Sequence, residues 1–262
     1  FTINADCIAP VIVRGNGGLA NVAFATNQTW ENVFVSDLNN TGAGIVNILS
    51  SNATNALGNF TTSFTNRTLF WVGNTGLWSN PANWSLSSGG AGGECIPTLN
   101  DDVFFDANSF NAAGQTVTVD INAQTRDITW IGASNNPTIT GLAAFNMEIG
   151  GDVTFITAPN MTWDFNGPVI FRYSDELEAD AKNVILSRGQ VFKNSVNFDD
   201  NNLAINGVWE LGDAFATNDA LFLTAGIFTT SPASYTLRAA NINVNQAGDL
   251  TRTINFNSSV TT

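Results

Sequence analysis

Three stretches in the C-terminal half decide the fold: MTWDFNGPVIF at residues 161–171, LAINGVWEL at 203–211 and ALFLTAGIFTT at 220–230. Each stretch holds two short runs rich in apolar and β-branched residues, with Gly or Asn between the runs, and in MTWDF apolar and polar residues alternate. Alternation with a period of two is typical of a strand that buries one face, and Gly or Asn between two such runs favours a turn. The repeating unit is therefore a strand, a corner and a second strand.

Seven runs of this kind follow one another, and they begin at Met147, Met161, Val184, Leu203, Ala220, Tyr235 and Arg252. Their mean spacing of roughly 18 residues, with two strands per repeat, is the size of one coil of a β-solenoid. One coil cannot bury its own apolar face, so coils must stack until their inward side chains form a continuous column. We therefore predict an all-β chain folded as a parallel β-solenoid, with Asn side chains at equivalent corners bonded from coil to coil.

An antiparallel β-sandwich is the alternative architecture. Each half of the repeat also matches the spacing of about 8–12 residues that is typical of sandwich strands. The two architectures differ in strand direction, because adjacent runs pair through hairpins in a sandwich and lie parallel in a solenoid.

The sequence divides into three parts. Residues 1–68 form an N-terminal β segment, which holds either further coils or a small separate sheet. Residues 69–110 form a corner and loop rich in Trp and Gly, and residues 111–262 hold the solenoid coils. The chain opens at Phe1 without Met, which predicts a mature product or a piece of a longer protein.

Composition excludes several classes of function. Nine basic residues against 22 acidic ones give a net charge of −13, which argues against binding of nucleic acid and against a polybasic membrane patch. The absence of histidine excludes Ser-His-Asp and Cys-His catalysis and imidazole zinc sites. No apolar run reaches the ~18–20 residues of a membrane span, so no direct membrane insertion is expected.

The polar surface must come from uncharged residues, because charged residues make up only 12% of the chain. The sequence instead holds 36 Asn and 29 Thr but two Lys, a composition common among secreted proteins. We therefore expect an extracellular location. In an oxidising compartment the two cysteines, Cys7 and Cys95, are expected to form a disulfide.

Three tryptophans lie close together, at Trp71, Trp78 and Trp84. As ligand-binding residues, their indole faces would stack on sugar rings. As structural residues, they would pack around a tight corner and seal the start of the apolar column from water. The choice depends on whether the three side chains are buried.

Acidic residues suggest a calcium site. Asp101, Asp102 and Asp106 flank a strand after a Gly-rich loop, and Ca²⁺ requires six to eight oxygen ligands. Calcium is the only cofactor for which we find candidate ligands, although a solvated acidic turn explains the same pattern. A second acidic run holds Asp175, Glu176, Glu178 and Asp180.

The stretch WVGNTGLWSNPANWS at residues 71–85, followed by PTLNDDVFFD at 97–106, resembles repetitive cell-surface proteins of Bacteroidetes-type bacteria. Such proteins are exported by the type 9 secretion system and include adhesins of gliding motility. The resemblance extends over residues 69–262. It implies a secreted β-solenoid whose partners are the rest of a larger surface protein or an outer-membrane assembly.

We therefore expect an extracellular structural or adhesive segment that serves as a rigid spacer or display surface, and no enzyme. A carbohydrate-binding module that meets polysaccharide through tryptophan is the alternative. A polysaccharide lyase or hydrolase is a second alternative, because two acids about 5–10 Å apart can cleave a glycosidic bond. Asp164, Glu210 and Asp213 are the candidate acids of a hydrolase. A lyase would instead need an Arg or Lys base beside calcium, for example Lys182 or Arg188 near Asp175.

Overall fold

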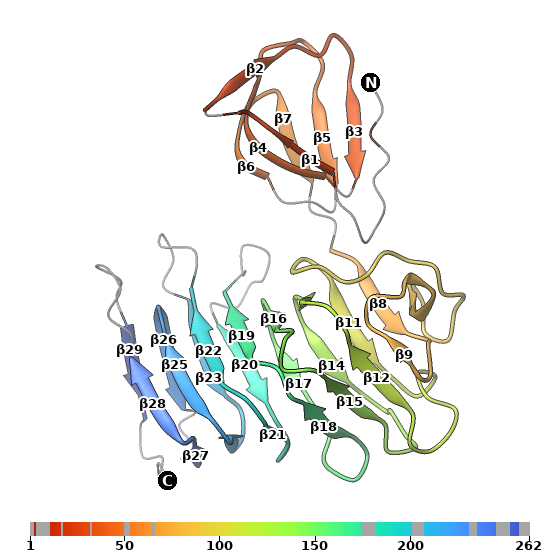
Figure 1. Ribbon diagram of the computed structural model, residues 1–262, viewed down its shortest axis with the longest axis vertical. Helices are drawn as coiled ribbons and strands as arrows, with labels where there is room; N and C mark the ends of the chain where they lie inside the picture. Colours follow the sequence, from red (N-terminus) through yellow and green to blue (C-terminus); the bar gives the residue numbers. More distant parts are fainter. Residues whose placement is uncertain are drawn as a thin grey trace. The chain divides into compact units, whose positions relative to one another are not determined.

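The protein is an all-β molecule of two compact units, Phe1–Arg67 and Thr68–Thr262 (Figure 1). This computed structural model describes residues 3, 11–16, 18–31, 33–49, 53–63, 66–173, 182–200, 207–230, 235–244 and 252–256. Within these ranges, helical structure is confined to one 3-10 turn, η1 (Pro81–Asn83). The two units are described separately.

The second unit winds around three faces, each built from strands contributed by successive coils. The first face holds β10 (Trp84–Ser85), β8 (Thr68–Trp71), β11 (Asp102–Phe105), β14 (Ile128–Trp130), β17 (Val153–Thr154), β20 (Asn183–Leu186), β23 (Val208–Leu211), β26 (Gly226–Thr230) and β29 (Arg252–Asn255). The second face holds two short sheets. One consists of β9 (Gly76–Leu77), β12 (Thr116–Val119), β15 (Thr138–Gly141) and β18 (Thr162–Phe165). The other consists of β21 (Val191–Phe192), β24 (Phe215–Thr217) and β27 (Leu237–Arg238). The third face holds β13 (Ala123–Thr125), β16 (Met147–Ile149), β19 (Val169–Arg172), β22 (Val196–Asp199), β25 (Ala220–Leu223) and β28 (Asn241–Val244).

Strand direction confirms the parallel β-solenoid and excludes the antiparallel sandwich. Among the described residues of this unit, all strand pairs are parallel except β10 with β8. Register is kept from coil to coil, because Val103 pairs with Ile128 and Ile128 pairs with Val153.

The predicted size of a coil in this unit is wrong. A full turn runs through three strands, as in the turn from Val103 to its paired residue Ile128. The turn from Val208 to Ile227 is shorter than this one, and the turn from Val153 to Ile185 is longer. The runs that give the predicted spacing of roughly 18 residues lie on consecutive faces of the stack. A parallel pair forms only when the chain returns to the same face, so a full coil is longer than that spacing.

Two-stranded coils of the predicted size occur instead in the first unit. One of its sheets holds β1 (Val11–Arg14), β2 (Ala20–Val22), β4 (Val33–Asn40) and β6 (Ala53–Gly58), and the other holds β3 (Gln28–Glu31), β5 (Val46–Leu49) and β7 (Phe60–Ser63), all in parallel pairs. Leu38 pairs with Ala20 in the preceding coil and with Ala56 in the following one. Trp30 and Ile48 belong to a separate apolar core within this unit. Of the two alternatives for residues 1–68, the described part therefore consists of coils.

Aromatic side chains form the column inside the second unit. The rings of Phe105 and Trp130, one coil apart, stack at 4.2 Å, and those of Phe171 and Phe198 stack at 4.8 Å. Strand residues alternate between this buried column and the surface, as in the buried–intermediate pattern of β12. Parallel register thus places each inward side chain directly against its counterpart in the next coil.

Asparagine side chains also bond from coil to coil, as the sequence predicted. In the first unit, Asn39 Nδ2 donates to Asn21 Oδ1 at 2.9 Å. In the second unit, Asn194 Nδ2 donates to the carbonyl oxygen of Asn166 at 2.8 Å. The Asn194–Asn166 bond lies at a corner between strands, as predicted, whereas Asn39 and Asn21 are paired strand residues of β4 and β2.

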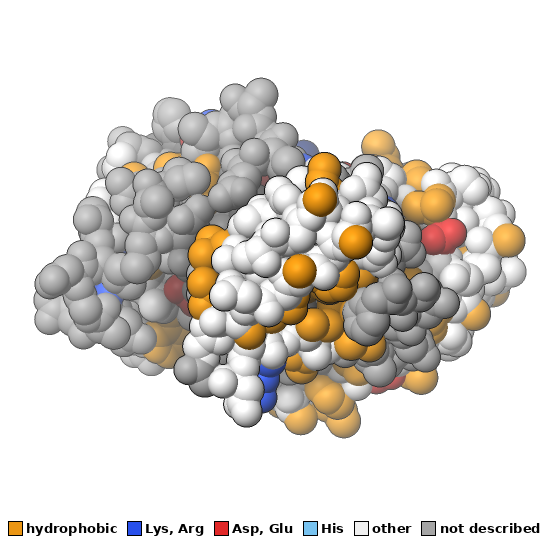
Figure 2. Space-filling model, turned by 90° about the horizontal axis from the view of Figure 1, so that it is seen from above, with side chains coloured by type: hydrophobic (Ala, Val, Ile, Leu, Met, Phe, Trp, Pro, Cys, Tyr) orange, Lys and Arg blue, Asp and Glu red, His pale blue; other side chains and the backbone are white. Residues whose placement is uncertain are grey.

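One face of the molecule is largely uncharged. In the face shown in Figure 2, the described side chains are mostly uncharged polar or hydrophobic, with few blue or red atoms among them. This agrees with the low content of charged residues.

The two ends of the described coil stack differ. At its start, the short strand β10 pairs antiparallel with β8 and interrupts the parallel ladder. At its other end, Ile242 and Val244 are 37% and 48% exposed, whereas Leu221 and Leu223, which pair with them one coil earlier, are fully buried. The last described coil therefore leaves part of the apolar column open to solvent.

Replacing Phe198 with Ala should destabilise the second unit by about 3–5 kcal/mol, because this buried ring contacts Phe171, Trp209 and Phe228. Phe222→Ala in the neighbouring strand is the matched control, since Phe222 is only partly buried, and it should cost about 1 kcal/mol. Urea unfolding of both full-length variants tests this difference. Equal losses in the two variants would contradict the inward and outward assignment of these rings.

Candidate functional site

The three clustered tryptophans are core residues. Trp71, Trp78 and Trp84 have no exposed surface. Trp84 packs edge-on against both others, with ring centroids 5.1 Å from Trp71 and 4.8 Å from Trp78. Its indole Nε1 donates to the Trp78 carbonyl oxygen at 2.9 Å. The prediction that these indoles stack on sugar is therefore wrong in this structure, because no indole face is open to a ligand.

Asn83 explains why glycines separate these tryptophans. Its side chain is nearly buried and donates to the Leu77 carbonyl oxygen at 2.8 Å. A Cβ added at Gly73 or Gly76 would lie only 2.5 or 2.3 Å from that side chain. Asn80 precedes the 3-10 turn and accepts a bond from the Ala82 N–H through Oδ1. The motif thus encodes a compact corner at the start of the coil stack.

The predicted calcium ligands do not form a cluster. The Asp101 carboxylate accepts bonds from the Thr98 N–H and hydroxyl, both at 2.8 Å. Asp102 forms a two-point ion pair with Arg126, at 2.7 and 2.6 Å. Asp106 accepts from the Asn108 N–H at 2.9 Å. Throughout the described ranges, no group of three or more His, Cys, Asp or Glu is arranged to hold a metal ion.

The candidate catalytic acids each pair with a basic residue from a neighbouring coil. The pairs are Asp164 with Lys193, Glu210 with Lys182, and Asp213 with Arg188. The structure therefore places these acids in separate ion pairs. The second acidic run, with Asp175, Glu176, Glu178 and Asp180, lies outside the described residues.

Cys95 is disulfide-bonded. Its predicted partner, Cys7, lies outside the described residues. The pairing of Cys7 with Cys95 stays a prediction.

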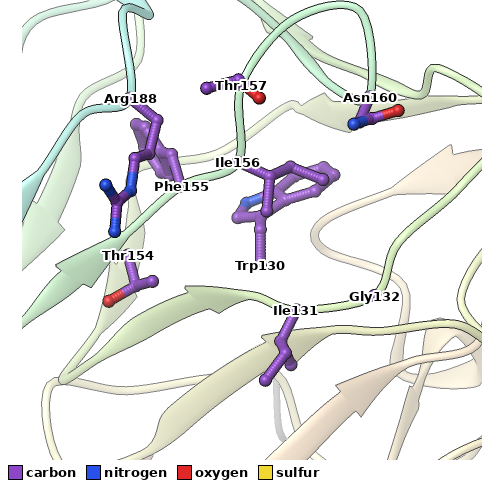
Figure 3. A pocket seen from close by; sticks show the side chains of 9 residues that line it. All are labelled: Trp130, Ile131, Gly132, Thr154, Phe155, Ile156, Thr157, Asn160 and Arg188. Atoms are coloured by element: carbon purple, nitrogen blue, oxygen red, sulfur yellow. The ribbon is translucent and has the colours of Figure 1, made fainter.

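A pocket of about 440 Å³ lies where three successive coils turn from the first face to the second. It was not predicted. The first coil contributes Trp130, Ile131 and Gly132, the second contributes residues from Thr154 to Asn160, and the third contributes Arg188 (Figure 3). In this view, the Ile156 side chain is drawn over the Trp130 indole, with Arg188 and Asn160 on opposite sides.

Buried hydrogen bonds hold the wall of this pocket. The side chain of Gln190 is nearly buried and donates from Nε2 to the carbonyl oxygens of Ile156 and Met161, at 3.2 and 3.1 Å. Its Oε1 accepts the Trp163 N–H at 3.0 Å. Gln190 therefore bonds to both ends of the loop between β17 and β18.

Asp213 fixes the turn that carries Arg188. Its carboxylate accepts the backbone N–H groups of Ser187 and Arg188, at 2.9 and 2.8 Å. Arg188 itself has a left-handed backbone conformation, with φ of 50°, and Gly189 follows with φ of 80°. The guanidinium is thus presented from a tight, bonded turn.

All seven tryptophans should be shielded from a neutral quencher, because none is more than 4% exposed. We expect acrylamide to quench the native fluorescence several-fold less than that of the protein in denaturing guanidinium chloride. Comparable quenching in the two states would show that the corner tryptophans are open to ligands after all.

The comparisons do not add to this geometry. No helix in the described part of the chain has the length and hydropathy needed to cross a membrane. No family model, curated protein or solved structure matches the chain.

Proposed function

We propose that this chain is an extracellular structural and adhesive segment of a larger bacterial cell-surface protein, in which it serves as a rigid spacer and display surface. The observation that carries this proposal is the parallel register of the second unit, in which each coil repeats the pairing of the one before it. A stack of this kind lengthens by one strand spacing, about 4.8 Å, for every coil added.

Ion pairs support the role of a stiff stack. Among the described residues, six contacts link basic and acidic side chains that lie 24 to 29 residues apart, which is about one coil. They join Asp102–Arg126, Glu148–Arg172, Arg172–Asp199, Lys182–Glu210, Arg188–Asp213 and Lys193–Asp164. Most of the few basic residues therefore form ion pairs with acidic residues of a neighbouring coil. Each contact contributes little by itself, but together they favour one register.

Two exposed apolar side chains in β28 support contact with further protein. Ile242 and Val244 face the column and are 37% and 48% exposed. In the larger surface protein that we propose, another coil or a partner would cover them. The motifs at residues 71–85 and 97–106 support a surface protein exported by the type 9 system.

Enzymatic cleavage of polysaccharide is less well supported. Its candidate acids, Asp164, Glu210 and Asp213, are each paired with a cation. A hydrolase would require two carboxylates that face one bond of the substrate. Turnover assays on acidic and neutral polysaccharides test this alternative directly.

Removal of one whole coil should leave a folded protein. Deletion of residues 128–152 joins Asp127 to Val153, which takes the register position of Ile128. We expect a folded chain with the same type of circular dichroism spectrum, slightly shorter by X-ray scattering, because each coil contacts its neighbours alone. The control deletes residues 128–140, about half a coil, which puts the following strand on the wrong face and should unfold the stack. Equal damage from both deletions would contradict the spacer role.

Surface labelling tests the location. An antibody raised against residues 68–262 should label intact cells of the source bacterium as strongly as permeabilised cells. Labelling that requires permeabilisation would overturn the extracellular assignment.

A further inference from the structure

We propose that the pocket lined by Trp130, Ile156 and Arg188 binds a saccharide that carries a carboxylate, such as a uronic acid residue. This adds a ligand class to the display surface. It does not depend on the tryptophan corner at the start of the stack, where the indoles are buried.

Arg188 is the feature that selects an anion. Its side chain is 47% exposed, and the nearest carboxylate oxygen, Asp213 Oδ2, lies 3.9 Å from its Nε. That distance is beyond a hydrogen bond. Arg126 provides the contrast, because its guanidinium already donates two short bonds to Asp102. Arg188 therefore forms an ion pair with Asp213 without donating a side-chain hydrogen bond to it, and its planar donors are available to bind a ligand carboxylate in two-point fashion.

The rest of the pocket matches a sugar ring. Ile131 is 60% exposed and, with the partly buried Ile156, offers an apolar surface for the C–H groups of a ring. Thr154, Thr157 and Asn160 offer hydroxyl and amide groups, and within the described residues their side chains have no hydrogen-bond partner. A few polar groups around an apolar patch are the usual composition of a small-molecule site.

The protein's own charge restricts the ligand further. At a net charge of −13, a densely charged polyanion would be repelled over the whole surface. A single carboxylate among neutral sugars meets Arg188 at much lower electrostatic cost. We therefore infer an oligosaccharide of low charge density, in which a uronic acid is flanked by neutral sugars.

The pocket is also held in shape before a ligand arrives. Gln190 bonds to both ends of one wall, and Asp213 bonds to the turn under Arg188. A preformed site loses less conformational freedom on binding.

Calorimetry with the full chain tests this proposal on two probes: a glucuronic acid–glucose disaccharide and the matching glucose disaccharide. The wild type should bind the acidic probe more tightly than the neutral one. Arg188→Gln should weaken binding of the acidic probe about tenfold or more, the loss typical of one charge-assisted interaction, and leave the neutral probe unchanged. Ile131→Ala should weaken both probes.

Arg238→Gln is the matched control, since Arg238 is another exposed arginine of the stack and lies outside the pocket. It should leave both affinities unchanged. The proposal is overturned by absence of binding to the wild type, by unchanged affinity in Arg188→Gln, or by an equal loss in Arg238→Gln. Circular dichroism of each variant confirms the fold. Failure of these tests would leave the spacer role intact, because that role is tested by the coil deletions and by surface labelling.

Discussion

The backbone hydrogen bonds that run from one coil to the next are the constraint on which the second unit depends. Because the strands pair in parallel and in register, every inward side chain must fit against its counterparts above and below. Phe171 and Phe198 satisfy this requirement as stacked rings, and the pairing of Leu221 with Ile242 continues the same register in β28. Packing, corner bonds and ion pairs all follow from the same vertical alignment.

Differences in length between coils are concentrated at the corners between strands. The short turn from Val208 to Ile227 and the long turn from Val153 to Ile185 both return the chain to its place in the ladder, so the extra residues lie between strands. The pocket is a product of this freedom, since it forms where the loop between β17 and β18 lies beside the turn that holds Arg188. A rigid framework thus positions side chains that belong to its least regular segments.

The sequence was sufficient to predict parallel stacked coils but not their length. A strand–corner–strand phrase such as MTWDFNGPVIF shows where two strands lie, yet it does not show how many faces the chain visits before it returns. The tryptophan corner was ambiguous for a related reason. The corner brings the side chain of Asn83 against Gly73 and Gly76, and spacing along the chain does not show that contact. The sequence indicates Arg188 only as a candidate base, because its neighbours in the pocket belong to earlier coils and lie far from it along the chain.

The direction of the ladder determines how the stack would respond to force. Its hydrogen bonds point along the axis on which coils are stacked, so tension along that axis opens them one coil at a time rather than all together in shear. Once freed, a coil as long as the turn from Val103 to Ile128 can extend to on the order of 80 Å. The same coil adds only about 4.8 Å to the length of the stack while it is folded. The second unit would therefore resist bending and compression, yet lengthen stepwise under a strong pull and dissipate mechanical work as it does so.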